Sequence, residues 1–342
     1  MALESAGTMG GMQRRHYAIK KTILLGLLAL LAAGCGGGRG GDEDTAGTTT
    51  ASSGGGSDLS GRIEADGSST VGPFTTAAAE RFQGENSDVQ VTVGVSGTGG
   101  GFERFCRGET DLSNASRPIK EEETKICEEG EIPYVEFQVA NDALTVVVNK
   151  DNDWVECLTV GQLKSIWEPG SKVGSWSDID SSFPDVKLRL FGPGTDSGTF
   201  DYFTDEINGE EGASRSDYAA SEDDNTTVTG VSGERGGLGY FGFSYFEENQ
   251  DSLKALAIDG GDGCVTPSVK NAQNGTYTPL ARPLFIYAKQ ESFERPEVEA
   301  FVSYILENET EIAEASQYVP LTTEQLEKAQ RDFEAAVQKA SG

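Results

Sequence analysis

The chain has 342 residues, of which 56 are Asp or Glu and 27 are Lys or Arg, so its formal net charge is −29 at pH 7. This acidity argues against a nucleic-acid partner, because affinity for a phosphate backbone requires a basic face. An anionic ligand would have to be held by local geometry against the overall field. Once a leader is removed, the length is sufficient for two domains of ordinary size.

The first 35 residues have the pattern of an export signal. Four basic residues precede the apolar run Ile23–Ala33, which is too short for an ordinary membrane span. The run ends in LAAGC, so small residues precede Cys35 as in a bacterial lipobox, where the cysteine becomes the lipidated first residue. Ala32 stands where a lipobox usually has Leu. We therefore predict lipidation at Cys35, and a plain secretory signal with an incidental cysteine is the alternative.

Residues 36–58 are rich in Gly, Ser and Thr and contain almost no apolar side chains. Such a composition cannot bury a core and predicts a flexible tether. Lipid anchor, tether and globular body together predict an exported protein, held on the outer side of the cytoplasmic membrane or in the periplasm.

Four cysteines follow the predicted leader: Cys106, Cys127, Cys157 and Cys264. An even number in an exported chain indicates two disulfides, for which the sequence allows three pairings. We favour Cys106–Cys127, which closes a short local loop, together with Cys157–Cys264. Free structural thiols are the alternative.

The chain contains a single histidine, His16, which lies in the predicted leader. The remaining sequence therefore lacks the base of a Ser-His-Asp triad or a Cys-His pair, and it lacks the usual ligand of zinc sites. We expect no catalytic residues, no metal and no cofactor. Nucleophiles that work without histidine and carboxylate–metal enzymes stay open on this ground alone.

One arrangement occurs three times in the chain: a strand-like run, a loop of Gly, Ser and Thr, and the start of a helix. The strands are expected at RIEA (residues 62–65), VQVTVGV (residues 89–95) and KLRLF (residues 187–191), and the loops are GSST, SGTGGG and GPGTDSGT. This alternation favours an α/β fold with parallel strands. In such folds ligands sit beyond the carboxyl ends of the strands, where the helices begin.

Helix starts of this kind carry unpaired N–H groups and a partial positive charge, so several of them together can surround a small tetrahedral anion. A single such loop is more often a turn with capping hydroxyls. The candidate hydroxyl donors in the three loops are Ser69, Thr70, Ser96, Thr98, Ser197 and Thr199.

Arg117 is the residue that indicates a negative charge on the expected ligand. It lies among small residues in LSNASRPIK and precedes Pro118, which favours an extended backbone. Arginine is suited to bidentate binding of phosphoryl oxygens. A surface arginine paired with one of the many carboxylates is the alternative.

The chain resembles the phosphate-binding receptors of bacterial phosphate ABC transporters from about Ile63 to Gln330. The resemblance rests on six segments in order: ADGSSTVGP, VSGTGGGFERFCRGETDLSNASRPI, LTVGQLKSIW, FGPGTDSGTFDYF, GGLGYFGFSYF and PLARPLFIY. It implies a two-domain α/β fold of the periplasmic-binding-protein type (type II-like), with the ligand in the cleft between the domains. It also implies a receptor without chemistry of its own, whose partners are inorganic phosphate and a membrane permease. We expect a monomer.

The resemblance implies that the ligand loops fall on Ser69 and Thr70, on Ser96 and Thr98, on Arg117, and on residues 197–199 (Ser197, Gly198 and Thr199). In the best-known branch of the family an Asp stands at the place of Arg117, and an Arg stands at the place of Pro193. The carboxylate that accepts the phosphate proton must therefore come from elsewhere. Our hypothesis assigns this role to Asp196, the carboxylate inside a ligand loop, with helix capping as its alternative role.

The domains are predicted at residues 59–140 plus 279–342 for the first and residues 141–278 for the second. The apolar segments Ala143–Asn149 and Pro283–Lys289 are the expected crossing strands. Two other functions stay open: a receptor of the same fold for sulfate or molybdate, and a secreted phosphatase that works without histidine.

Overall fold

The computed structural model describes residues 59–342, so the predicted leader, Cys35 and the predicted tether lie outside the described residues. The described residues belong to one compact unit and alternate between strands and helices. The strands are β1 (Gly61–Gly67), β2 (Val89–Val93), β3 (Leu112–Ala115), β4 (Tyr134–Asn149), β5 (Cys157–Thr159), β6 (Arg189–Gly192), β7 (Ala219–Ala220), β8 (Gly237–Gly242), β9 (Leu253–Ala255), β10 (Ala257–Asp259), β11 (Cys264–Val265) and β12 (Ala281–Lys289).

Helices follow most of these strands. They are α1 (Gly72–Glu85), α2 (Gly97–Cys106), α3 (Glu121–Glu129), α4 (Val160–Trp167), α5 (Trp176–Ile179), α6 (Gly198–Phe203), the π-helix η1 (Thr204–Asn208), α7 (Asp224–Gly233), α8 (Phe243–Asn249), α9 (Val269–Gln273), the 3-10 helix η2 (Gln290–Glu294), α10 (Pro296–Glu307), α11 (Glu309–Ala315) and α12 (Thr323–Ala340). The predicted alternation of strand, small-residue loop and helix is therefore confirmed at β1–α1, β2–α2 and β6–α6.

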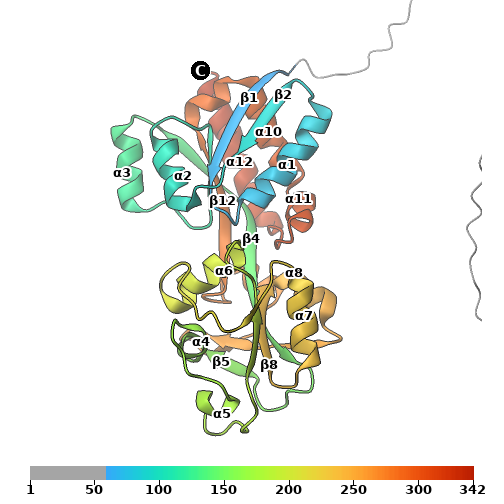
Figure 1. Cartoon of the computed structure of the whole chain (residues 1–342). Helices are drawn as coiled ribbons and strands as arrows, with labels where there is room; N and C mark the ends of the chain where they lie inside the picture. Colours follow the sequence, from blue (N-terminus) through green and yellow to red (C-terminus); the bar gives the residue numbers. More distant parts are fainter. Residues whose placement is uncertain (1–58) are drawn as a thin grey trace, which may run out of the picture. The chain divides into compact units, whose positions relative to one another are not determined.

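The main sheet has nine strands in the order β2-β1-β3-β12-β4-β8-β6-β7, with β9 paired to β4 outside this path. The pairs β1–β2, β1–β3 and β6–β8 are parallel, as expected for an α/β fold. The long strand β4 pairs antiparallel with β12 on one side and with β8 on the other, and Figure 1 shows β4 and β12 as neighbouring strands. The loops after β1, β2 and β3 consequently leave the sheet at the same edge.

Two large hydrophobic cores and several smaller clusters form around these strands. The first packs α1, α10 and α12 against β1 and the amino-terminal half of β4, and it contains Phe74, Phe82, Phe137 and Phe301. The second packs α4, α6 and β8 around the rest of β4, and it contains Trp167, Trp176, Phe203 and Tyr240. β4 is buried along most of its length because successive parts of it belong to different cores.

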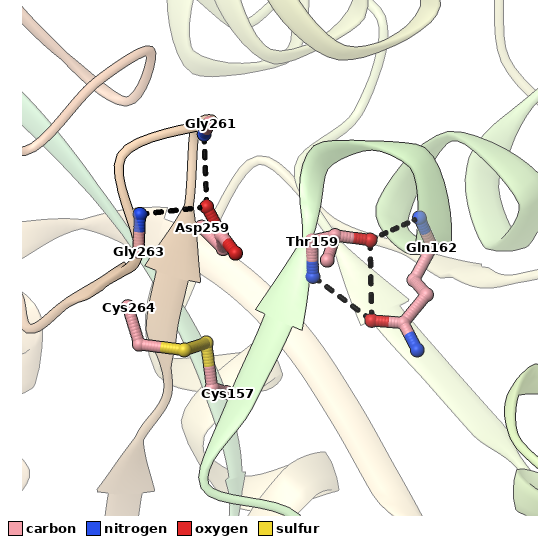
Figure 2. Close-up of a disulfide and its surroundings, with 7 residues drawn as sticks. All are labelled: Cys157, Thr159, Gln162, Asp259, Gly261, Gly263 and Cys264. Carbon is pink, nitrogen blue, oxygen red and sulfur yellow. Dashed lines mark hydrogen bonds between the residues drawn. A yellow bond between two sulfur atoms is a disulfide. The ribbon is translucent and has the colours of Figure 1, made fainter.

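Two disulfides close loops inside these regions. Cys106 at the end of α2 is bonded to Cys127 of α3, and Cys157 of β5 is bonded to Cys264 of β11, which are the two pairs favoured from the sequence. The second bond joins two strands of a small sheet with the order β11-β10-β5 (Figure 2). The first bond packs in a cluster with Phe285 and Tyr287 of β12, but neither bond links β4 to β12 covalently.

Local capping explains how α4 begins beside the second disulfide. The Thr159 side chain accepts a hydrogen bond from the Gln162 backbone N–H at 3.1 Å, and the Gln162 side chain accepts one from the Thr159 backbone N–H at 2.9 Å (Figure 2). This reciprocal arrangement satisfies two donors that a helix start leaves unpaired.

Across residues 59–342, none of the helices combines the length and the apolar character that a membrane crossing needs.

Candidate functional site

A polar cavity of about 390 Å³ lies where the loops after β1, β2 and β3 meet α6, η1 and β12. Hydroxyl groups and glycines make up much of its wall, and charged side chains of both signs complete it. The lining residues are Ser68, Ser69, Thr70, Ser96, Gly97, Thr98, Gly99, Gly100, Ser116, Arg117, Lys120, Asp201, Tyr202, Asp205, Glu206, Glu211 and Arg282.

Close packing of glycines brings the first two loops together. A Cβ atom on Gly101 of α2 would lie 2.5 Å from the Gly67 Cα atom at the end of β1, a distance that a larger side chain could not keep. Helix α2 can therefore pack directly on the loop after β1. Ser96 and Thr98, at the start of α2, thereby line the same cavity as Ser69.

The hydroxyl groups of this wall differ in whether they already form hydrogen bonds within the protein. Ser68 Oγ accepts hydrogen bonds from the Thr70 and Val71 backbone N–H groups at 3.2 and 3.4 Å, so it shapes the loop. Thr98 Oγ1 lies 3.1 Å from Ser116 Oγ and connects the loops after β2 and β3. Ser96 precedes α2 without a capping hydrogen bond from its side chain, which leaves its hydroxyl available to a ligand.

Arg117 lines the cavity, where it forms one half of an ion pair. Its Nη2 and Nη1 atoms donate to Glu123 Oε1 and Oε2 at 2.7 and 2.8 Å, and its guanidinium lies over the Phe102 ring. Burial disfavours the charged form of Glu123, but hydrogen bonds from Arg117 and from the Lys120 backbone hold the pKa of Glu123 below its usual range. The pair is therefore ionised, and Glu123 fixes the direction of the guanidinium.

The loop Gly192–Thr199 lies next to the loop after β1. A Cβ atom on Gly198 would lie 3.2 Å from Thr70 Oγ1, closer than an ordinary contact, so glycine lets the two loops approach without a shift of Thr70. Ser197 Oγ accepts a hydrogen bond from the Thr199 backbone N–H at 3.2 Å and begins α6. These three residues and Asp196 are not part of the cavity lining. Asp196 is exposed, and its backbone N–H donates to Glu222 at 3.4 Å.

The carboxylate that does line the cavity near this loop is Asp201, in the first turn of α6. Burial raises the pKa of Asp201, and the neighbouring Glu211 raises it further, whereas a hydrogen bond from Ser69 and the charge of Arg282 oppose the shift. Asp201 is therefore a partly buried carboxylate that holds a proton more readily than an ordinary one. It faces the hydroxyl wall of the cavity through its contact with Ser69.

The sequence prediction missed the charged lining residues other than Arg117, which are Lys120, Asp201, Asp205, Glu206, Glu211 and Arg282. Two of them had a signal: Asp201 lies two positions after the Ser-Gly-Thr loop, and Arg282 is a charged residue inside the apolar run PLARPLFIY. The arrangement can hold a small oxyanion through its hydroxyls, backbone N–H groups and cations, while the carboxylates of Asp201, Asp205, Glu206 and Glu211 line the same cavity. Within residues 59–342, no group of three or more His, Cys, Asp or Glu side chains is placed to hold a metal ion.

Comparison with known proteins places these features in a family. The family model described as a PBP superfamily domain matches residues 44–309. The chain is 50% identical to the protein SphX of Synechococcus elongatus, over 79% of this chain and 81% of that protein. It is 42% identical to the phosphate-binding protein PstS of Staphylococcus epidermidis, over 77% of this chain and 79% of that protein.

A solved structure resembles the fold closely. It is a crystal structure described as a possible phosphate binding protein from Planctomyces limnophilus, with 47% sequence identity and a TM-score of 0.79. The similarity covers 82% of this chain and 99% of that chain. The predicted fold is thus confirmed by comparison as well as by the arrangement of strands.

Proposed function

The chain belongs to the PBP superfamily, and from this membership we propose that it is an extracytoplasmic receptor that binds inorganic phosphate and delivers it to the permease of an ABC transporter. The observation that carries the proposal is the cavity wall, where hydroxyls from three strand ends meet Arg117 in a chain whose relatives have phosphate-binding names. The proposed ligands are Ser69, Thr70, Ser96, Thr98, Arg117, Ser197, Gly198 and Thr199, with Asp196 or Asp201 as the acceptor of the phosphate proton.

Three of these proposed ligands, Ser197, Gly198 and Thr199, reach the anion only if their loop moves toward the cavity. Gly198 lies close to Thr70, which does line the cavity. Such a movement is the kind that closure of two domains on a ligand would produce.

Titration calorimetry tests the proposal. The chain that begins at residue 36 should bind one phosphate per monomer, and it should bind sulfate and molybdate much more weakly. Preference for sulfate or molybdate would instead identify a receptor for another oxyanion. Hydrolysis of a chromogenic phosphoester would identify a phosphatase, whereas a receptor should show none.

The two cores support a division of the chain into two domains. We propose residues 59–140 plus 279–342 as the first and residues 141–278 as the second, with β4 and β12 as the connecting strands. Each disulfide then lies within one domain. We expect small-angle scattering to show a smaller radius of gyration when phosphate is added. An unchanged radius at saturating phosphate would contradict closure of the domains.

A lipid anchor at Cys35 is proposed from the LAAGC sequence alone. In a bacterial host, the wild-type chain should partition into the detergent phase after Triton X-114 extraction, and Cys35→Ser should remain in the aqueous phase. Mass spectrometry should find acyl chains on the first residue of the mature wild-type protein. An exported wild-type chain that carries no lipid would establish the plain secretory signal instead.

A further inference from the structure

Arg282 is a cation at the cavity whose partners come from widely separated parts of the chain. It lies on β12 directly opposite Asp142 of β4 in the strand register. Its Nε atom donates to Asp142 Oδ2 at 3.3 Å, and its Nη2 atom donates to Thr70 Oγ1 at 2.7 Å. The side chain is only 16% exposed, so both contacts are made in a partly dehydrated place.

The guanidinium also stacks on an aromatic ring of α6. Its central carbon lies 3.4 Å from the centre of the Tyr202 ring, and Tyr202 is held in turn because its hydroxyl donates to the Pro279 carbonyl at 2.6 Å. A cation over a ring is stabilised by the negative face of that ring. Arg282 therefore touches the loop after β1, the β4–β12 pair and α6 at the same time.

The contact with Thr70 determines how that hydroxyl can be used. Because Thr70 Oγ1 accepts a hydrogen bond from Arg282, its own hydrogen is free to be donated to a group in the cavity. Among residues 59–342, Arg282 Nη1 has no hydrogen-bond partner, so the guanidinium also keeps a donor of its own.

The hydrogen bond from Arg282 to its carboxylate partner is weaker than those from Arg117, although the charge of Arg282 also acts on Asp201 and Glu206. Arg117 makes two short hydrogen bonds to one ionised carboxylate, whereas Arg282 makes a single longer one to Asp142. Burial raises the pKa of Asp142, although the charge and the hydrogen bond of Arg282 oppose this shift. Arg282 therefore offers positive charge to an anion in the cavity in addition to that of Arg117.

We propose that Arg282 is a second anion-binding cation of this site, that it makes Thr70 a donor to the anion, and that Asp142 is its positioning residue. This inference rests on the proposed phosphate-binding function. It also gives the PLARPLFIY segment a role, because the arginine of this segment lies on strand β12 and places a positive charge at the cavity. The alternative is a cross-strand ion pair that only stabilises the fold.

Calorimetry with inorganic phosphate on matched variants separates the two roles. Arg282→Gln should weaken phosphate binding roughly ten- to a hundred-fold, the range for loss of one charge-assisted hydrogen bond. Asp142→Asn keeps the cation but loosens its position, so its loss should be smaller. The control is Arg235→Gln, which removes a cation that lies over Trp154 and pairs with Asp153 outside the cavity lining. It should bind phosphate as the wild type does.

Arg282→Gln leaves Asp142 buried without its partner and can lower stability, so the double variant Arg282→Gln/Asp142→Asn decides the matter. Its unfolding temperature without phosphate should recover toward that of the wild type, while its phosphate affinity should stay low. Wild-type affinity in the double variant would overturn the inference and leave the proposed function intact. Absence of phosphate binding by the wild type would instead refute the proposed function.

Discussion

Replacement of Arg117 by Ala is expected to weaken phosphate binding by roughly two to four orders of magnitude. In the proposed complex Arg117 pairs with the buried phosphate, so its removal leaves the anion without that cation. Loss of one partner of a buried ion pair costs about 3–5 kcal/mol, and each tenfold change in affinity corresponds to about 1.4 kcal/mol. The same change takes from the largely buried Glu123 the cation that compensates it at the cavity wall. The unpaired carboxylate would also repel the anion. Calorimetry at constant ionic strength measures the effect.

A double variant, Arg117→Ala/Glu123→Gln, distinguishes the two contributions. If repulsion by the uncompensated carboxylate causes part of the loss, neutral Gln at position 123 should restore part of the affinity. The remaining loss then measures the contact between Arg117 and the anion. Tight phosphate binding by Arg117→Ala itself would remove Arg117 from the site and leave it a structural partner of Glu123.

Replacement of Asp201 by Asn is expected to admit sulfate to the site. Hydrogen phosphate keeps a proton near neutral pH and can donate it to a buried carboxylate, whereas sulfate has no proton to donate. A site built around one acceptor rejects the analogue that leaves this acceptor unpaired, and such rejection can be large. Asp201 lines the cavity and contacts Ser69, one of the proposed ligands. Sulfate competition against bound phosphate measures the change.

Asp196→Asn is the matched variant, because the hypothesis from the sequence gives Asp196 the same role. Asp196 is exposed and outside the cavity lining, so we expect the larger change of selectivity from Asp201→Asn. If Asp196→Asn alone admits sulfate, Asp196 is the proton acceptor and comes into the site on closure. If neither variant admits sulfate, the discriminating acceptor lies elsewhere.

The pH dependence of sulfate binding follows from the direction of the Asp201 shift. Burial and Glu211 raise the pKa of Asp201, so it takes up a proton at a higher pH than an ordinary carboxyl group does. A protonated Asp201 can donate to sulfate. Sulfate binding by the wild type should therefore become stronger as the pH falls through this raised pKa. In Asp201→Asn this dependence should become weaker, and what remains is expected from Glu206, which lines the same cavity and whose pKa burial also raises.

Local sequence determined the elements that carry most of the proposed ligands. The loops GSST and SGTGGG each lie between a strand and a helix, and such a pattern is readable because it depends on neighbouring residues alone. Arg117 beside Pro118 is likewise a local feature, and it does line the cavity. The alternation that indicates parallel strands also follows from spacing and composition, whereas the sequence allowed three cysteine pairings and the structure shows the favoured one.

Only the tertiary structure decided which charged residues join these loops. Arg282 meets Asp142 through the register of β12 on β4, and it meets Thr70 across 212 positions of the chain. Asp201 rather than Asp196 lines the cavity, because the direction of each side chain depends on how α6 packs against β8 and the loop after β1. Strand register and helix packing are set by the burial of apolar side chains far apart in sequence. For this reason no local pattern could place these two charges beside the hydroxyls that they face.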